Sequence, residues 1–262
     1  MYLYKKGYST SSLNLARSSL NFFTDITEDL GSNPYVLRLF KYFYRKRPLL
    51  SKYIVFWPVE KLLSFLKSWH PIVDLNLKQL TIKTVALLAL ATSDRGQTLN
   101  LLRIDKMHIS DSKITFVVTD RLKNTRKSLK PKVVTCPTCS DESLNVKSYM
   151  ESYLEKTAEF RNEYKSVFLS WSTKRPVTKS TLARWLKFAL SLAEIDTSVY
   201  SAHSYRGSGL SNAYSKGVRI EEIVKAGDWK NVQTFFSHYL GHSSNSPVGQ
   251  IILENNSHQG KN

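Results

Sequence analysis

The chain has 262 residues, enough for one large domain or for a small domain joined to a larger one. Hydrophobic residues make up 42% of it, which excludes a wholly disordered chain because that fraction can bury a sizeable core. The 38 lysines and arginines outnumber the 21 acidic residues and give a formal net charge of +17. A surplus of that size attracts polyanions, so nucleic acid is the first candidate partner and an anionic membrane face the second.

Sequence patterns argue against the membrane-spanning, exported and disulfide-stapled classes of protein. The longest apolar run, residues 85–91, is far shorter than the about 20 residues that a spanning helix needs. The N-terminal segment has neither an apolar signal region nor a small-residue cleavage site. The two cysteines, Cys136 and Cys139, are too few for a disulfide framework. We therefore expect a soluble, intracellular protein with no membrane partner.

The beginning of the chain is basic and helical in pattern. Apolar residues at helical spacing predict helices over residues 9–23, 35–44 and 58–69, with a loop between the first two. Residues 1–72 are therefore expected to form a small all-α domain. On sequence alone, its lysines and arginines are equally compatible with a solvated surface and with a binding face.

From residue 77 onward, the pattern is mainly helical with a short β-hairpin. Alternating β-branched residues predict strands over 114–119 and 132–135, joined by the long basic segment 120–130. Ser93 and Asp94 are expected to cap the start of the helix over 95–103. The expected helices are 80–92, 95–103, 144–156, 180–193, 201–214, 220–226 and 231–239. The fold class is thus mainly α with a small β-sheet, followed by a polar, mobile tail over 243–262.

Motifs for nucleotide, dinucleotide, zinc-hydrolase and serine-hydrolase chemistry do not occur in the sequence. The run from Cys136 to Cys139 has the spacing of half a zinc ribbon, but no second pair follows at a suitable distance. We interpret the two cysteines as part of a turn between a strand and a helix. No metal and no cofactor are expected.

The most informative stretch contains His203 and Arg206. On a helix, residues three apart share a face, and an arginine must stay charged and needs an anion or water beside it. The segment Gly-Asp-Trp229 and then Tyr239 follow further along the chain. The alternative for Tyr239 is simple packing with Phe235 and Phe236.

Six side chains resemble, in type and in order, the catalytic set of the tyrosine recombinases (the phage-integrase family): Arg95, Lys123, His203, Arg206, Trp229 and Tyr239. The stretches 89–102, 176–186 and 193–203 further resemble eukaryotic mobile-element recombinases of the DIRS and Crypton kind. The resemblance spans roughly residues 30–242. It departs from many relatives at Thr98, where they place an acidic residue.

The resemblance implies a chemistry for these residues. Tyr239 would attack a DNA phosphodiester to form a 3′-phosphotyrosine, while Arg95 and Arg206 would hold the non-bridging oxygens of the transition state. Lys123 would protonate the departing 5′-oxygen, although Arg121, Lys127 and Lys130 share its hairpin. His203 would handle the tyrosine proton or hold the phosphate. Trp229 would donate its indole N–H to a phosphate oxygen. His238, next to Tyr239, would contact the DNA backbone or face solvent rather than catalyse.

The resemblance also implies an architecture and partners. Residues 1–72 would be a truncated core-binding domain, and 73–242 the catalytic domain, the two enclosing double-stranded DNA. The enzyme would be a DNA recombinase or integrase of a transposable element, acting in the nucleus as a homo-tetramer on synapsed sites. Alternatives are a domesticated, non-catalytic DNA-binding protein and a type IB topoisomerase-like enzyme. Candidate phosphate contacts are Arg38, Lys41, Arg45, Lys46 and Arg47.

Overall fold

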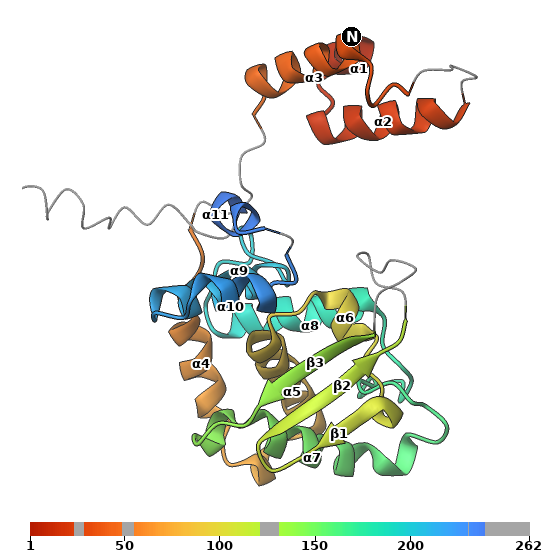
Figure 1. The fold of residues 1–262 in the computed structure, drawn as a ribbon. Coiled ribbons are helices and arrows are strands. Elements are labelled where there is room, and N and C mark those ends of the chain that lie inside the picture. Colours follow the sequence, from red (N-terminus) through yellow and green to blue (C-terminus); the bar gives the residue numbers. More distant parts are fainter. Residues whose placement is uncertain (24–28, 49–54, 121–130, 230, 239–262) are drawn as a thin grey trace, which may run out of the picture. The chain divides into compact units, whose positions relative to one another are not determined.

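The computed structural model describes residues 1–23, 29–48, 55–120, 131–229 and 231–238. The chain divides into two compact units, Met1–Lys52 and Tyr53–Asn262. Figure 1 shows the helices of each unit and the small sheet of the second. The first compact unit therefore ends earlier than the expected domain boundary at residue 72.

The first unit is helical, as its apolar spacing predicts. Its elements are α1 (Tyr2–Lys5), α2 (Thr10–Phe23) and α3 (Pro34–Lys46). The side chain of Asn33 accepts hydrogen bonds from the first backbone N–H groups of α3, which fixes the start of that helix. Leu13 of α2 packs with Phe40 and Phe43 of α3 in a small core, and the ring of Tyr4 stacks on Phe43 at 4.2 Å.

The third expected helix, α4 (Val59–Ser68), belongs to the second unit. Its Leu62 and Leu66 are fully buried in the large core of that unit. Just before the helix, the indole N–H of Trp57 donates to the Ser204 hydroxyl at 2.7 Å. These contacts join α4 to residues far along the chain, so its helical periodicity alone could not show to which unit the helix belongs.

The core of the second unit is built around α5 (Leu77–Thr92), which contacts α7, α8, α9 and β3. A capping box between Asn76 and Gln79 starts the helix earlier than its apolar pattern indicates. Nearly all of its middle is buried, including Lys83. A helix that is apolar on all its faces is buried on every side. The other elements of the second unit therefore pack around α5.

The sheet has the strand order β1-β2-β3 and is antiparallel (Figure 1). It consists of β1 (Met107–Ile109), β2 (Lys113–Val118) and β3 (Lys132–Pro137). Ile114 and Phe116 face Cys136 and Val134 across the ladder, and all four are buried. The alternation predicts β2 and β3 correctly. The short β1 was not foreseen, because three residues carry too little periodicity.

Between α5 and the sheet, α6 (Gly96–Asn100) is shorter than the helix expected over 95–103. The chain leaves the helix because it pairs with a distant segment: Arg103 forms a β-bridge with Ser166, and the Val167 N–H donates to the Leu102 carbonyl at 2.9 Å. Tertiary hydrogen bonding here overrides a local helical pattern.

The remaining expected helices are present: α7 (Val146–Thr157), α8 (Lys179–Leu192), α9 (Ser204–Ser215), α10 (Ile220–Ala226) and α11 (Gln233–His238). Short 3₁₀ turns lie at Ile72–Asp74, Ile104–Lys106, Glu142–Leu144 and Ala158–Phe160. Leu210, Ile223 and Phe235 form a separate small core that joins α9, α10 and α11, the group at the upper end of the second unit in Figure 1. Within the described part of the chain, no helix is long and apolar enough to cross a membrane.

Candidate active site

The first expected site residue, Arg95, lies at the turn between α5 and α6. After α5 ends at Thr92, Ser93 adopts a left-handed backbone conformation with a φ of 50°. The expected capping role of Ser93 and Asp94 is wrong: Ser93 closes α5, since its N–H donates to the Ala89 carbonyl at 3.1 Å, and the N-cap of α6 is Arg95 itself. The side chain of Arg95 remains 31% exposed.

An ion pair holds this turn against the sheet. The Asp94 carboxylate lies 2.5 Å from the ammonium of Lys132, at the start of β3. Only 5% of the Asp94 side chain is exposed, so this carboxylate is largely removed from water and needs its cationic partner. The pair therefore fixes the position of the residue directly before Arg95.

The second arginine, Arg206 of α9, is almost fully buried and bonds to the same turn. Its Nη1 donates to the Ser93 carbonyl at 3.0 Å, and its Nη2 donates to the Gly227 carbonyl. Its guanidinium also lies over the ring of Trp229, 4.7 Å from the centroid. A planar fork of donors can bridge two carbonyls in this way, whereas an ammonium presents a single point of charge. Arg206 therefore joins the turn that carries Arg95 to the segment after α10.

That segment, Gly227-Asp228-Trp229, meets both arginines. Asp228 has a left-handed backbone with a φ of 45°, and its carboxylate Oδ2 lies 3.6 Å from Nη1 of Arg95. The ring of Trp229 folds back over Gly227 so closely that a Cβ there would lie 2.3 Å from the ring. The chain therefore requires glycine at this position. The tripeptide supplies a carbonyl and a ring to one arginine and a carboxylate to the other.

His203 and Arg206, expected on one face of a helix, lie at the start of α9. His203 is the N-cap residue of α9 rather than a residue within it, but its backbone is already helical. His203 is exposed, while Arg206 lies one turn deeper in the protein. The histidine is therefore the solvent-facing member of the pair.

A pocket of about 470 Å³ lies beside these residues, between β3 and α10. One side carries the ion pair of Asp94 and Lys132, and the other carries Glu222, Lys225 and Asp228. Its lining combines these charged groups with alanine and valine side chains, so it is a recess of mixed character beside Asp94, the residue directly before Arg95.

Two of the expected site residues cannot be placed. Lys123, together with the other cations of the hairpin tip, and Tyr239 lie outside the described residues. The last described residue before Tyr239 is His238, the end of α11, and this short helix is attached to α9 and α10 through the fully buried Phe235. The structure thus brings together Arg95, Arg206 and Trp229.

The sequence profile of the phage integrase family matches residues 56–246. The chain belongs to the phage integrase family. This match covers the second unit from residue 56 to beyond the end of its described part, and it agrees with the resemblance to tyrosine recombinases found in the sequence motifs. A search among curated protein sequences found no match.

Solved structures of tyrosine recombinases have the same fold as this phage-integrase chain. XerA recombinase is 15% identical, with a TM-score of 0.55 over 97% of this chain and 84% of that one. The Tn1549 transposon integrase in complex with transposon right end DNA is 14% identical, with a TM-score of 0.57 over 96% and 82%. XerH bound to its difH substrate in a pre-cleavage complex is 15% identical, with a TM-score of 0.52 over 74% of this chain. The match spans 50% of the XerH chain.

The ion pairs around the integrase-family arginines, Asp228 with Arg95 and Asp94 with Lys132, were not foreseen from the sequence. Asp228, Asp94 and Lys132 are distant from one another along the chain, and their pairing depends on how α5, β3 and α10 meet. The one available signal was the presence of an acid next to a motif residue, in Asp94-Arg95 and Asp228-Trp229, in a chain with few acids. Thr98, where the sequence resemblance has its one noted departure, is buried in α6.

Of the two cysteines expected in a turn between a strand and a helix, only Cys139 lies outside the strand. Cys136 is buried at the end of β3, where desolvation raises the pKa of its thiol to about 12, and Cys139 is exposed in the following turn. Both are free thiols. Among the residues that the structure describes, no cluster of three or more histidines, cysteines or acids is placed to hold a metal ion.

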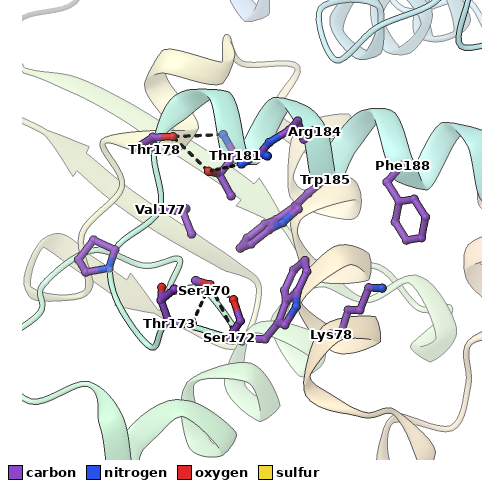
Figure 2. A pocket seen from close by; sticks show the side chains of 12 residues that line it. Lys78, Ser170, Ser172, Thr173, Val177, Thr178, Thr181, Arg184, Trp185 and Phe188 are labelled. Carbon is purple, nitrogen blue, oxygen red and sulfur yellow. Dashed lines mark hydrogen bonds between the residues drawn. The ribbon is translucent and has the colours of Figure 1, made fainter.

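A second pocket, of about 510 Å³, lies near the opposite end of α5 from Arg95. Figure 2 shows Lys78 of α5 facing Phe188 of α8, with the ammonium 5.0 Å from the ring centroid. The indole of Trp185 stacks on that of Trp171 at 4.4 Å. Because Lys78 and Thr92 are at opposite ends of a helix of 16 residues, roughly 20 Å separates this pocket from the arginine site.

Proposed function

We propose that this protein is a site-specific DNA recombinase that cuts and rejoins DNA strands through a covalent 3′-phosphotyrosine. The observation that carries the proposal is the pairing of two arginines at one turn: Arg206 bonds to the Ser93 carbonyl, and Arg95 follows two residues later. Two guanidiniums gathered in one place suit a phosphate group, because each presents planar, paired donors to its oxygens.

In the proposed reaction, the Oη of Tyr239 attacks phosphorus and forms a P–O bond, while the bond from phosphorus to the 5′-oxygen breaks. Lys123 protonates that leaving oxygen, and His203 receives the tyrosine proton or holds the phosphate. Arg95 and Arg206 stabilise the extra negative charge of the transition state. Attack by a 5′-hydroxyl reverses these steps and frees Tyr239, so rejoining conserves the phosphodiester energy.

Trp229 has a position that supports this role. Its ring lies against the Arg206 guanidinium, so it holds the arginine plane in place by a cation–π contact. Its indole N–H is the group proposed to meet a phosphate oxygen. The tight packing over Gly227 keeps this ring where it is.

The first unit is proposed to contact the DNA backbone. Arg38, Lys41 and Arg45 are all exposed, and their spacing places them on the face of α3 opposite its two buried phenylalanines. Arg47 has a second task, because its guanidinium donates to the Tyr4 carbonyl at 3.1 Å and covers the Tyr4 ring. Binding through many phosphates should weaken steeply as salt rises. We further propose assembly as a tetramer on paired sites and a nuclear mobile-element role, for which the support is the resemblance of the sequence motifs to DIRS and Crypton recombinases.

A nicked suicide duplex tests the proposal. The protein is incubated with labelled DNA made from candidate element ends, without metal or ATP, and the products are separated on a denaturing gel. We expect a protein–DNA adduct that peptide mass mapping assigns to Tyr239. The variant Tyr239→Phe should bind the same DNA and form no adduct.

Two results would overturn the assignment. Tight, salt-sensitive binding without any adduct, on DNA shown by footprinting to be occupied, would make the protein a binding-only descendant. Adduct formation by a monomer that relaxes supercoils and exchanges no strands would make it topoisomerase-like.

A further inference from the structure

Asp228 holds a negative charge at the place where the proposed function needs a phosphate. Its carboxylate lies 3.6 Å from Nη1 of Arg95, one of the two guanidiniums that would grip the DNA. We infer that Asp228 is an internal competitor of the DNA phosphate for Arg95, which must be displaced or outweighed before that arginine can hold DNA. The inference rests on the proposed function, since it concerns the same arginine.

The backbone holds Asp228 in this position. The left-handed φ of 45° follows directly on the C-terminal turn of α10, where the Asp228 N–H donates to the Lys225 carbonyl at 3.0 Å. On its two sides, the Gly227 carbonyl accepts from Arg206, and the Trp229 ring packs against that arginine. Two anchored neighbours thus direct the carboxylate toward Arg95.

The contact is loose enough to be exchanged. At 3.6 Å it is an ion pair beyond hydrogen-bond distance, and 31% of Arg95 and 48% of Asp228 are exposed. Exposed pairs of this kind contribute little stability. A DNA phosphate offers Arg95 the same charge and can approach as a bidentate acceptor at shorter range. The carboxylate therefore lowers the affinity of Arg95 for phosphate without blocking it.

Asp94, an acid of the same recess, differs in each of these respects. Asp94 is buried and lies 2.5 Å from Lys132, so its charge is neutralised within the protein. It holds the turn in place, whereas Asp228 lies at the exposed edge beside the guanidinium. Competition with phosphate is for this reason assigned to Asp228.

The variant Asp228→Asn tests the inference because asparagine has the same shape and tolerates a left-handed backbone. Glu221→Gln is the matched control: it removes one negative charge from an exposed position on α10, the helix just before Asp228. The readout is the dissociation constant for a duplex of fixed sequence, by fluorescence anisotropy at low salt. We expect Asp228→Asn to bind about twofold to fivefold more tightly than the unmodified chain, and Glu221→Gln to change less.

A double-mutant cycle shows whether the gain acts through Arg95. In an Arg95→Ala background, Asp228→Asn should change affinity no more than Glu221→Gln does. An equal gain in both backgrounds, or weaker binding by Asp228→Asn with an unchanged melting temperature, would overturn the inference. Because the readout is binding, it stands apart from the adduct assay: a chain that forms no adduct can still show the competition, and a chain that forms one can lack it.

Discussion

The ammonium of Lys83 lies 2.6 Å from the hydroxyl oxygen of Tyr149, inside the core between α5 and α7. The same ammonium donates to the Trp69 carbonyl at 2.7 Å and lies 4.0 Å from the centroid of the Tyr149 ring. The His70 ring nitrogen also contacts the Tyr149 hydroxyl, at 3.1 Å. These contacts join the end of α4 to α5 and α7 through a buried polar cluster, and they make the stability of the second unit depend on pH.

Burial lowers the pKa of Lys83 from 10.5 to about 8 and raises that of Tyr149 from 10 to about 12. Between pH 8 and pH 10.5, the unfolded chain keeps a Lys83 proton that the folded chain has lost, so this group makes the free energy of unfolding rise with pH. Above pH 10, the tyrosine acts in the opposite sense. Urea unfolding of the unmodified chain and of Lys83→Met at pH 7, 8.5 and 10 measures the difference. We expect the difference between the two free energies of unfolding to change between pH 8 and pH 10 by more than the experimental error. A constant difference would contradict the lowered pKa of Lys83.

Replacement of Arg206 by lysine should harm catalysis more than binding. An ammonium cannot bridge the Ser93 and Gly227 carbonyls and offer further donors to a phosphate, so we expect the rate of adduct formation to fall by about 10²–10³. Affinity for DNA should change only slightly, because the charge remains. Single-turnover adduct kinetics give the rate, and Arg184→Lys, at an exposed position of α8, serves as the control. If the rate of Arg206→Lys stays within about threefold of that of the unmodified chain, the planar, paired donors of the guanidinium are not needed.

Replacement of Gly227 by alanine should displace Trp229. The new Cβ would lie 2.3 Å from the indole ring, so the ring must move, at a cost of about 1–3 kcal/mol in the free energy of unfolding. Tryptophan fluorescence and urea unfolding report the two effects. Gly96→Ala is the matched control, because nothing lies within 4 Å of its Cβ position in α6. Equal stability of the two variants would mean that the ring accommodates a methyl group freely.

The sequence was most informative where a structure depends on neighbouring residues. The period of α3, the alternation of β2 and the start of α10 are local properties, and all agree with the structure. Arg95, Arg206 and Trp229 could be singled out from the sequence because the resemblance depends only on residue type and on order along the chain.

The missed features depend on contacts between distant segments. The place of α4 in the second unit follows from the burial of Leu62 and Leu66, and the early end of α6 follows from pairing with residues 166–167. The contact between Asp228 and Arg95 joins segments separated by most of the second unit. No local pattern contains such information.

Because Lys83 is fully buried, its chemical modification can report the opening of the core. An amine that loses its proton at lower pH than other lysines is intrinsically more reactive toward acylating reagents, yet Lys83 has no exposed surface in the folded chain. Acylation of Lys83 can therefore proceed only while α5 and α7 are parted. The extent of acylation at Lys83, measured by peptide mass, would therefore report how often the core of the second unit opens.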